Sequence, residues 1–126
     1  MSTCATIVIE IPKNKKGKTY EFGLNDKFEF STPNTVIPQD ANYVSVYHHF
    51  DGDILGKTLL EYNDFDTIMS ELICGGDMSF IGRPYHGWRN EDWKYVQPKF
   101  TEAKPEPFIY YTYYFNLDKK WECSKI

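Results

Sequence analysis

Residues 43–76, "YVSVYHHFDGDILGKTLLEYNDFDTIMSELICGG", decide the fold class. The first seven residues alternate between two faces, which is typical of a strand. Aspartate and glycine then break the alternation, and apolar residues return at helical spacing in two runs. The first run predicts a short helix over about 54–62, which Asp53 would cap, and the second predicts a helix over about 64–74, capped by Asn63 or Asp64. We expect the two glycines that close the stretch to end the second helix in a left-handed cap.

Extended patterns lie on both sides of this stretch. A run rich in β-branched residues covers 3–11, and an aromatic run at 108–117 carries large side chains on both faces. We expect the first run to form a hairpin with 19–24. Shorter strands are predicted at 27–31, 78–82 and 120–124. The order predicts one α+β domain over residues 1–126, with an antiparallel β-sheet and both helices packed on one face.

Composition limits the function classes. The chain has 126 residues, of which 41% are hydrophobic, and its net charge is -4. A nucleic-acid-binding protein usually carries a basic footprint, so direct nucleic-acid binding is not expected. Aromatic residues reach 17%, which suits either a binding surface and self-association or a small core filled with rings. The basic cluster is predicted to be a solvated hairpin tip; it contains Lys13, Lys15, Lys16 and Lys18.

The three cysteines, Cys4, Cys74 and Cys123, are widely spaced and form no CxxC pair. Zinc and a disulfide framework are therefore not expected, and a reduced cytosolic setting follows. No signal peptide and no apolar run of membrane length is found in the sequence. No GxSxG motif is present, and no cysteine has a histidine near it in sequence, which leaves a pairing in space open. We therefore expect no enzyme, no catalytic residue and no cofactor.

The segment "HHFDGD" has two interpretations. Adjacent histidines on a strand point to opposite faces, so His48 and His49 cannot easily bind one metal ion. His48 with Asp51 or Asp53 would supply nitrogen and oxygen ligands. The alternative, which we favour, is that Asp51 and Gly52 form a turn. The following "DGDILGK" offers backbone amides to an anion but lacks the Walker spacing, which argues against ATP hydrolysis.

The segment "YHGWRNEDW" concentrates rings and guanidinium groups within the long region 83–107. Planar rings and arginines hold nucleotide bases and phosphates, and they also form hot spots of protein interfaces. The alternative is a loop that its tryptophans pin to the domain. The residues concerned are Arg83, Tyr85, His86, Trp88, Arg89 and Trp93.

Blocks in the middle of the chain resemble a family of small, uncharacterised proteins encoded by phages and prophages. That family carries Y-x-H-x-D-G, G-x-x-L-L-x-x-Y, G-D-x-S-x-x-G and a Y-H…R-x-E-D-W stretch, in this order. The family's usual tyrosine and proline after Asp-Gly are replaced here by Asp53 and Ile54, and Tyr62 comes one position early. The matching residues are Tyr47, His49, Asp51, Gly52, Gly56, Leu59, Leu60, Tyr62, Gly76, Asp77, Ser79, Gly82, Tyr85, His86, Arg89, Glu91, Asp92 and Trp93. The resemblance implies a phage origin more than a chemistry.

Small acidic phage proteins often disable bacterial immunity by binding, and this analogy gives the main expectation. We expect a non-enzymatic protein that blocks a defence effector, as anti-CRISPR proteins do, in the bacterial cytoplasm. The alternatives are a sponge for a cyclic-nucleotide or ADP-ribose-type immune signal, a metal-dependent nucleotide or phosphodiester hydrolase, and a structural module. The two-faced aromatic run adds an expectation of homo-oligomers. The expected binding residues are His49, Asp51, Lys57, Arg83, Tyr85, His86, Trp88, Arg89 and Trp93.

Overall fold

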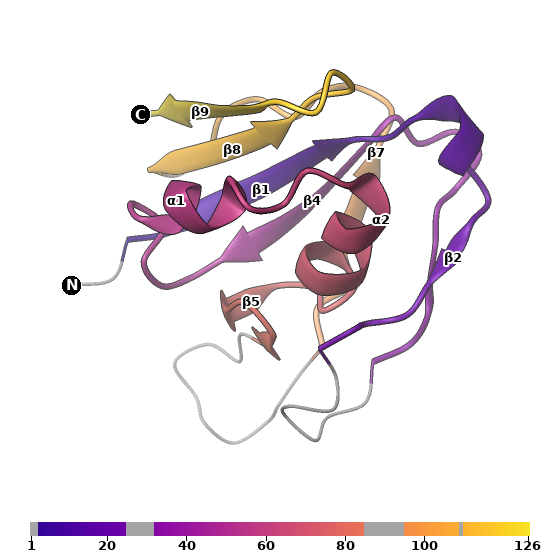
Figure 1. The fold of residues 1–126 in the computed structure, drawn as a ribbon, viewed down its shortest axis with the longest axis horizontal. Helices are drawn as coiled ribbons and strands as arrows, with labels where there is room; N and C mark the ends of the chain where they lie inside the picture. Colours follow the sequence, from indigo (N-terminus) through magenta and orange to yellow (C-terminus); the bar gives the residue numbers. More distant parts are fainter. Residues whose placement is uncertain (1–2, 25–31, 85–94, 109) are drawn as a thin grey trace.

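The computed structural model describes residues 3–24, 32–84, 95–108 and 110–126 and has an α+β fold (Figure 1). The main sheet has the strand order β6-β5-β4-β1-β8-β9, and β7 also pairs with β4. Its strands are β1 (Ala5–Glu10), β4 (Tyr43–His48), β5 (Met78–Phe80), β6 (Arg83–Pro84), β7 (Lys99–Thr101), β8 (Tyr111–Phe115) and β9 (Trp121–Lys125).

The sheet is mixed, not antiparallel as the sequence predicted. β1 pairs with β4 in antiparallel fashion over six residue pairs, but it pairs with β8 in parallel. β4 and β5 are also parallel, because the chain leaves β4 through the helices before it returns. Parallel neighbours need a long crossover, which the alternation of a strand does not reveal.

The predicted hairpin of 3–11 with 19–24 is wrong. Both edges of β1 are taken by β4 and β8, which come from distant parts of the chain. β2 (Thr19–Tyr20) pairs instead with β3 (Thr35–Val36) in a separate two-stranded sheet. Pairing of β1 with β4 places Ile7 and Ile9 opposite Val46 and Val44, and all four side chains are buried. The strand predicted at 27–31 lies outside the described residues.

Both predicted helices form, in shorter pieces. α1 spans Leu55–Leu59, and α2 spans Phe65–Ile68 before the chain continues as a π-helical segment, Met69–Ile73. Asp64 caps α2, since its carboxylate accepts a hydrogen bond from the Thr67 amide at 3.0 Å. Asp53 does not cap α1: Ile54 holds the N-cap position without a side-chain hydrogen bond. The helical segment ends before Gly76, which has a φ of 71° as the sequence predicted.

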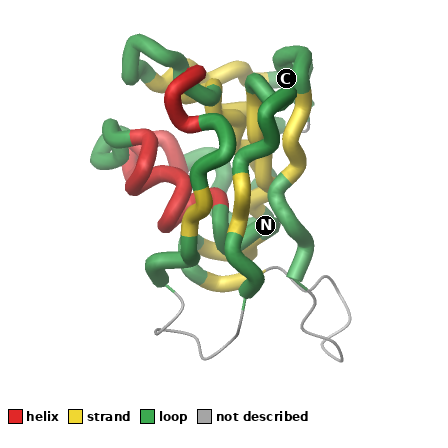
Figure 2. Tube along the Cα trace, turned by 90° about the vertical axis from the view of Figure 1, so that its right-hand side faces the viewer, coloured by secondary structure: helices red, strands yellow, loops and turns green. Residues whose placement is uncertain are grey.

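The helices cover one face of the sheet, and we call it the helix face. Figure 2 shows α2 and the π-helical turns on one side of the strands. Alternate residues of β1, β4 and β8 pack there against both helices. The buried side chains of this core include Ile7, Ile9, Val44, Val46, Leu59, Ile68, Leu72, Tyr113 and Phe115.

On the other face, here called the second face, the segment that precedes β8 covers β8. The Tyr114 hydroxyl donates to the Pro105 carbonyl at 2.8 Å. Thr112 Oγ1 donates to the Phe108 carbonyl at 3.1 Å and accepts from the Phe108 amide at 2.9 Å. Residues 105–108 of the same chain therefore contact the second face of the aromatic strand, and the expected homo-oligomer stays a prediction.

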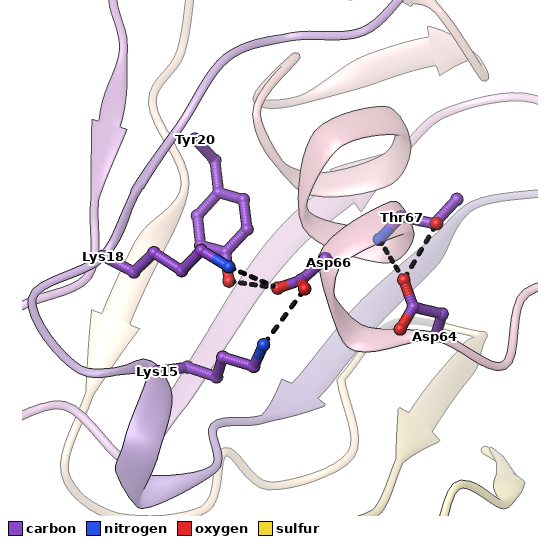
Figure 3. Close-up of polar contacts among 6 residues, drawn as sticks. All are labelled: Lys15, Lys18, Tyr20, Asp64, Asp66 and Thr67. Atoms are coloured by element: carbon purple, nitrogen blue, oxygen red, sulfur yellow. Dashed lines mark hydrogen bonds and ion pairs between the residues drawn. The ribbon is translucent and has the colours of Figure 1, made fainter.

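The basic cluster is not a solvated hairpin tip. A 3-10 turn at Lys13–Lys15 brings Lys15 and Lys18 within 3.0 and 3.4 Å of the Asp66 carboxylate on α2 (Figure 3). The Tyr20 hydroxyl donates to the same carboxylate at 2.6 Å. This hydrogen bond is the main reason that the pKa of Asp66 is lowered to about 2. Lys15 and Lys18 thus link the chain after β1 to α2 through ion pairs.

Candidate functional site

The segment that follows β4 is a tight turn, as the favoured interpretation predicted. Asp51 has a φ of 57°, a left-handed conformation that aspartate tolerates better than most residues. The Gly52 amide donates to the Thr3 carbonyl at 2.8 Å, and the Gly52 carbonyl accepts from the Tyr113 hydroxyl at 2.5 Å. A Cβ on Gly52 would lie 2.8 Å from the Thr3 oxygen, so only glycine fits. The turn therefore ties the end of β4 to β1 and β8.

The two histidines point to opposite faces, as strand geometry predicted. His48 lies on the helix face with 2% of its surface exposed, and its Nδ1 accepts or donates no hydrogen bond among the described residues. Burial lowers the pKa of His48 to about 4. His49 lies on the second face and is also buried, and burial lowers its pKa as well. Both imidazoles are therefore neutral at pH 7.

His49 belongs to a cluster with Cys4 and Tyr47. The Tyr47 hydroxyl oxygen lies 2.7 Å from His49 Nδ1 and 2.9 Å from Cys4 Sγ. Cys4 Sγ lies 3.9 Å from His49 Nδ1. The antiparallel register, in which Thr6 lies opposite Tyr47, brings the start of β1 beside the end of β4. The sequence had left a spatial cysteine–histidine pairing open, and the structure supplies one.

An open cleft of about 650 Å³ lies beside this cluster on the second face. Thr6, Ser45 and Tyr47 form its floor on β1 and β4. Its walls come from residues 96–101 and 105–108, which include the apolar side chains of Val96, Pro98, Pro105 and Phe108. Clefts of about 300–1,000 Å³ are typical of ligand sites in proteins.

Asp77 is the most buried charged group of the cleft. Its carboxylate accepts a hydrogen bond from the Tyr47 amide at 2.9 Å, and its own amide donates to the Val96 carbonyl at 3.0 Å. Burial raises the pKa of Asp77, while the hydrogen bond from Tyr47 opposes this rise. Asp77 forms no ion pair with a described residue. The other charged side chains of the described lining are Lys99 and Glu106, so this part of the lining carries two carboxylates and one ammonium group.

The expected binding residues do not all meet at this cleft. His49 contacts Tyr47, which lines the cleft. The other three described residues are exposed outside the cleft: Asp51 in the turn, Lys57 on α1 and Arg83 on β6. Arg83 lies opposite Phe80, whose ring stacks on Phe50 at 5.0 Å. The remaining five, Tyr85, His86, Trp88, Arg89 and Trp93, lie outside the described residues.

The sequence analysis missed several groups of the site. No sequence motif indicated a binding role for Cys4, Asp77 or Lys99. The resemblance already singled out Tyr47 and Asp77, but it assigned them no role. The sequence did contain one signal for this cluster: side chains alternate between two faces along 3–11 and 43–49, so Cys4 and Tyr47 each lie on a definite face of their own strand. Only the register between the strands shows that these are the same face.

Two further findings concern metals and membranes. Within residues 3–24, 32–84, 95–108 and 110–126, no three side chains of histidine, cysteine, aspartate or glutamate are grouped as metal ligands would be. In the same part of the chain, no helix has the length and apolar character to span a bilayer.

Fold and site together define a small α+β domain with an open, mostly apolar cleft beside a Cys–Tyr–His cluster. No family model, curated protein or solved structure matches the chain.

Proposed function

We propose that the protein is a phage-encoded, non-enzymatic antagonist of bacterial immunity that blocks a defence effector by binding a polypeptide segment in the cleft of the second face. The observation that carries the proposal is the cleft itself, with mostly apolar walls and a few converging polar groups. The phage origin rests on the resemblance of the middle blocks.

The charge of the cleft favours a polypeptide over a phosphorylated signal. Cyclic nucleotides and ADP-ribose carry phosphates that need cations or converging amides. The described lining offers Lys99 alone as a cation and places Asp77 and Glu106 near it. The described part of the lining therefore carries a net negative charge, which would repel a phosphate. A neutral or basic segment of a protein avoids this repulsion.

Asp77 gives the segment a specific contact. Asp77 has no ion pair with a described residue, and the burial of its carboxylate costs free energy, which is the reason for its raised pKa. A lysine or arginine of the partner would offset this cost and gain a charge-assisted hydrogen bond. The apolar walls would meanwhile accept the neighbouring side chains. We therefore assign a basic side chain of the partner to the Asp77 end of the cleft.

The experiment is the plaquing efficiency of a phage panel on bacteria that express this protein beside individual defence systems. We expect plaquing to be restored against one system whose effector is a protein complex. Asp77→Asn should weaken rescue and binding of the purified effector by about tenfold or more, because it removes the charge but keeps an acceptor for the Tyr47 amide. Glu61→Gln is the matched control, since it removes the same charge from an exposed position outside the cleft.

The other outcomes separate the alternatives. Rescue limited to a nucleotide-signalling system, with loss of the free signal from solution, would replace the proposal with a sponge. Turnover of a phosphodiester by the purified protein with added divalent metal would replace it with the hydrolase. A growth defect of the deleted phage in hosts with and without defence systems would indicate a structural module.

A further inference from the structure

The thiol of Cys4, the hydroxyl of Tyr47 and the imidazole of His49 form a continuous chain of polar groups. The proposed contact of the partner with Asp77 does not use these three groups, although Tyr47 also lines the cleft. Their atoms are ordered as Sγ, phenol oxygen and Nδ1, with separations of 2.9 and 2.7 Å. The direct distance from Sγ to Nδ1 is 3.9 Å, so the phenol bridges the thiol and the imidazole. Cys4 is partly exposed, while His49 is buried behind it.

The hydrogen count of the phenol makes this chain a proton relay. A tyrosine hydroxyl has one hydrogen, so it can donate to Sγ or to Nδ1 but not to both. In one arrangement the thiol donates to the phenol oxygen, and the phenol donates to a neutral Nδ1. In the other, a protonated Nδ1 donates to the phenol oxygen, and the phenol donates to a thiolate. The two arrangements differ only by the shift of one proton along each hydrogen bond.

We propose that Cys4 is a reactive thiol that undergoes exchange with disulfides, with Tyr47 and His49 moving its proton. The sulfur of Cys4 attacks one sulfur of the disulfide while its proton passes to the phenol and the phenol proton passes to His49 Nδ1. A new sulfur–sulfur bond forms and the old one breaks. The departing thiolate takes a proton from the imidazolium through the same relay or from water, so the exchange needs no other oxidant.

The buried position of His49 suits this role. In the tautomer that carries its hydrogen on Nε2, a neutral imidazole leaves Nδ1 able to accept a proton, and burial lowers the pKa of His49, which favours the neutral form. The ring is also fixed, since it packs edge-on against Phe50 at 4.6 Å between centroids. A fixed acceptor loses little freedom when it takes the proton, which favours positioned proton transfer.

The chain contains its own reference thiols. Cys74 is fully buried, and burial raises its pKa, so it is shielded from reagents in the folded protein. Cys123 is exposed on β9. Among the described residues, Cys4 alone of the three has a histidine contact. Cys123 has Tyr113 beside it but no histidine among the described residues, so it reports the rate of an accessible thiol without a basic partner.

The test compares the rates at which the two accessible thiols react with the neutral disulfide 4,4′-dithiodipyridine. Cys123→Ser leaves Cys4 as the accessible thiol, and Cys4→Ser leaves Cys123. We expect Cys4 to react about tenfold faster or more at pH 7 although it is less exposed. Mass spectrometry of digested protein after treatment with glutathione disulfide should find the mixed disulfide on Cys4.

Variants of the relay separate proton transfer from simple access. In the Cys123→Ser background, Tyr47→Phe keeps the ring but removes the bridging hydroxyl, and His49→Asn keeps a polar atom near Nδ1 that cannot take a proton. Each should slow Cys4 by about tenfold or more, a typical loss for a general base. Neither should change the rate of Cys123 in the Cys4→Ser background. A Cys4 that reacts no faster than Cys123, or whose rate is unchanged in a relay variant that remains folded, overturns the proposal.

Discussion

His48 is the residue whose environment departs most from what its chemistry prefers. It is almost fully buried on the helix face, and its Nδ1 has no partner among the described residues. A charged imidazole there would lose its hydration without compensation, which explains why burial lowers the pKa from 6.5 to about 4. Since Asp51 and a backbone hydrogen bond at Phe50 oppose this shift only partly, the folded protein resists protonation of His48.

This resistance predicts a loss of stability in mild acid. Below pH 6.5 His48 becomes protonated in the unfolded chain but stays neutral in the folded protein. The free energy of unfolding therefore falls as the pH drops from 6.5 to about 4, and below about pH 4 His48 causes no further decrease. The shift corresponds to about 3 kcal/mol. His48→Leu, which has similar volume and no proton to bind, should lack this decline. Urea unfolding at pH 7, 5.5 and 4 checks it, and parallel pH curves for both proteins would contradict the assignment.

Residue-level predictions succeeded where the interaction is local. The Asp64 cap and the left-handed Gly76 depend on neighbours within a few positions, and the sequence contains both. The Cys4–Tyr47–His49 cluster depends on strand register across more than forty residues, which alternation alone does not fix. Sequence reasoning therefore named His49 as a binding residue, but it gave its two partners no role.

At the scale of elements, the starts of the two helices form a matched comparison. Both α1 and α2 follow an aspartate, but only Asp64 bonds to its helix, through the Thr67 amide and hydroxyl at 3.0 Å each. Asp64→Ala should therefore lower the free energy of unfolding by about 1 kcal/mol. Asp53→Ala should leave it nearly unchanged, because Asp53 is exposed and Ile54 holds the N-cap position of α1. Equal losses in thermal unfolding of the two variants would show that Asp53 acts as a cap in solution.

The same scale shows where pattern reasoning ends. The strands at 43–48, 78–80 and 121–125 and both helices were predicted, since each has its own periodicity. The partners of β1 were not predicted. Strand pairing depends on the surface that distant strands bury against each other, which the pattern of a single strand does not show. β8 is the parallel neighbour of β1, and β5 is the parallel neighbour of β4; each pair is joined by a long crossover. The turn residues after β1 led to the wrong prediction of a local hairpin.

For the whole molecule, the decisive feature is that one chain covers both faces of the aromatic strand β8, while the second face of β1 and β4 stays open as the cleft. The helical layer lies over one face, and residues 105–108 cover the aromatic strand β8 on the other. The same segment forms a wall of the cleft, so covering the sheet and shaping the site depend on one set of contacts. Thr112 anchors it, because its fully buried hydroxyl bonds to both the amide and the carbonyl of Phe108.

Thr112→Val tests this coupling with a nearly isosteric change. The variant loses both hydrogen bonds and leaves the Phe108 amide without its side-chain acceptor, so we expect a loss of about 1–3 kcal/mol in unfolding free energy. The loosened segment should uncover β8, and light scattering should then show more self-association than in the parent at equal concentration. Binding at the cleft should weaken as well, since its wall moves.

Thr58→Val, at an exposed position on α1, is the control and should change none of these quantities. A Thr112→Val protein that is destabilised but neither associates nor binds more weakly would show that the cover and the cleft are independent.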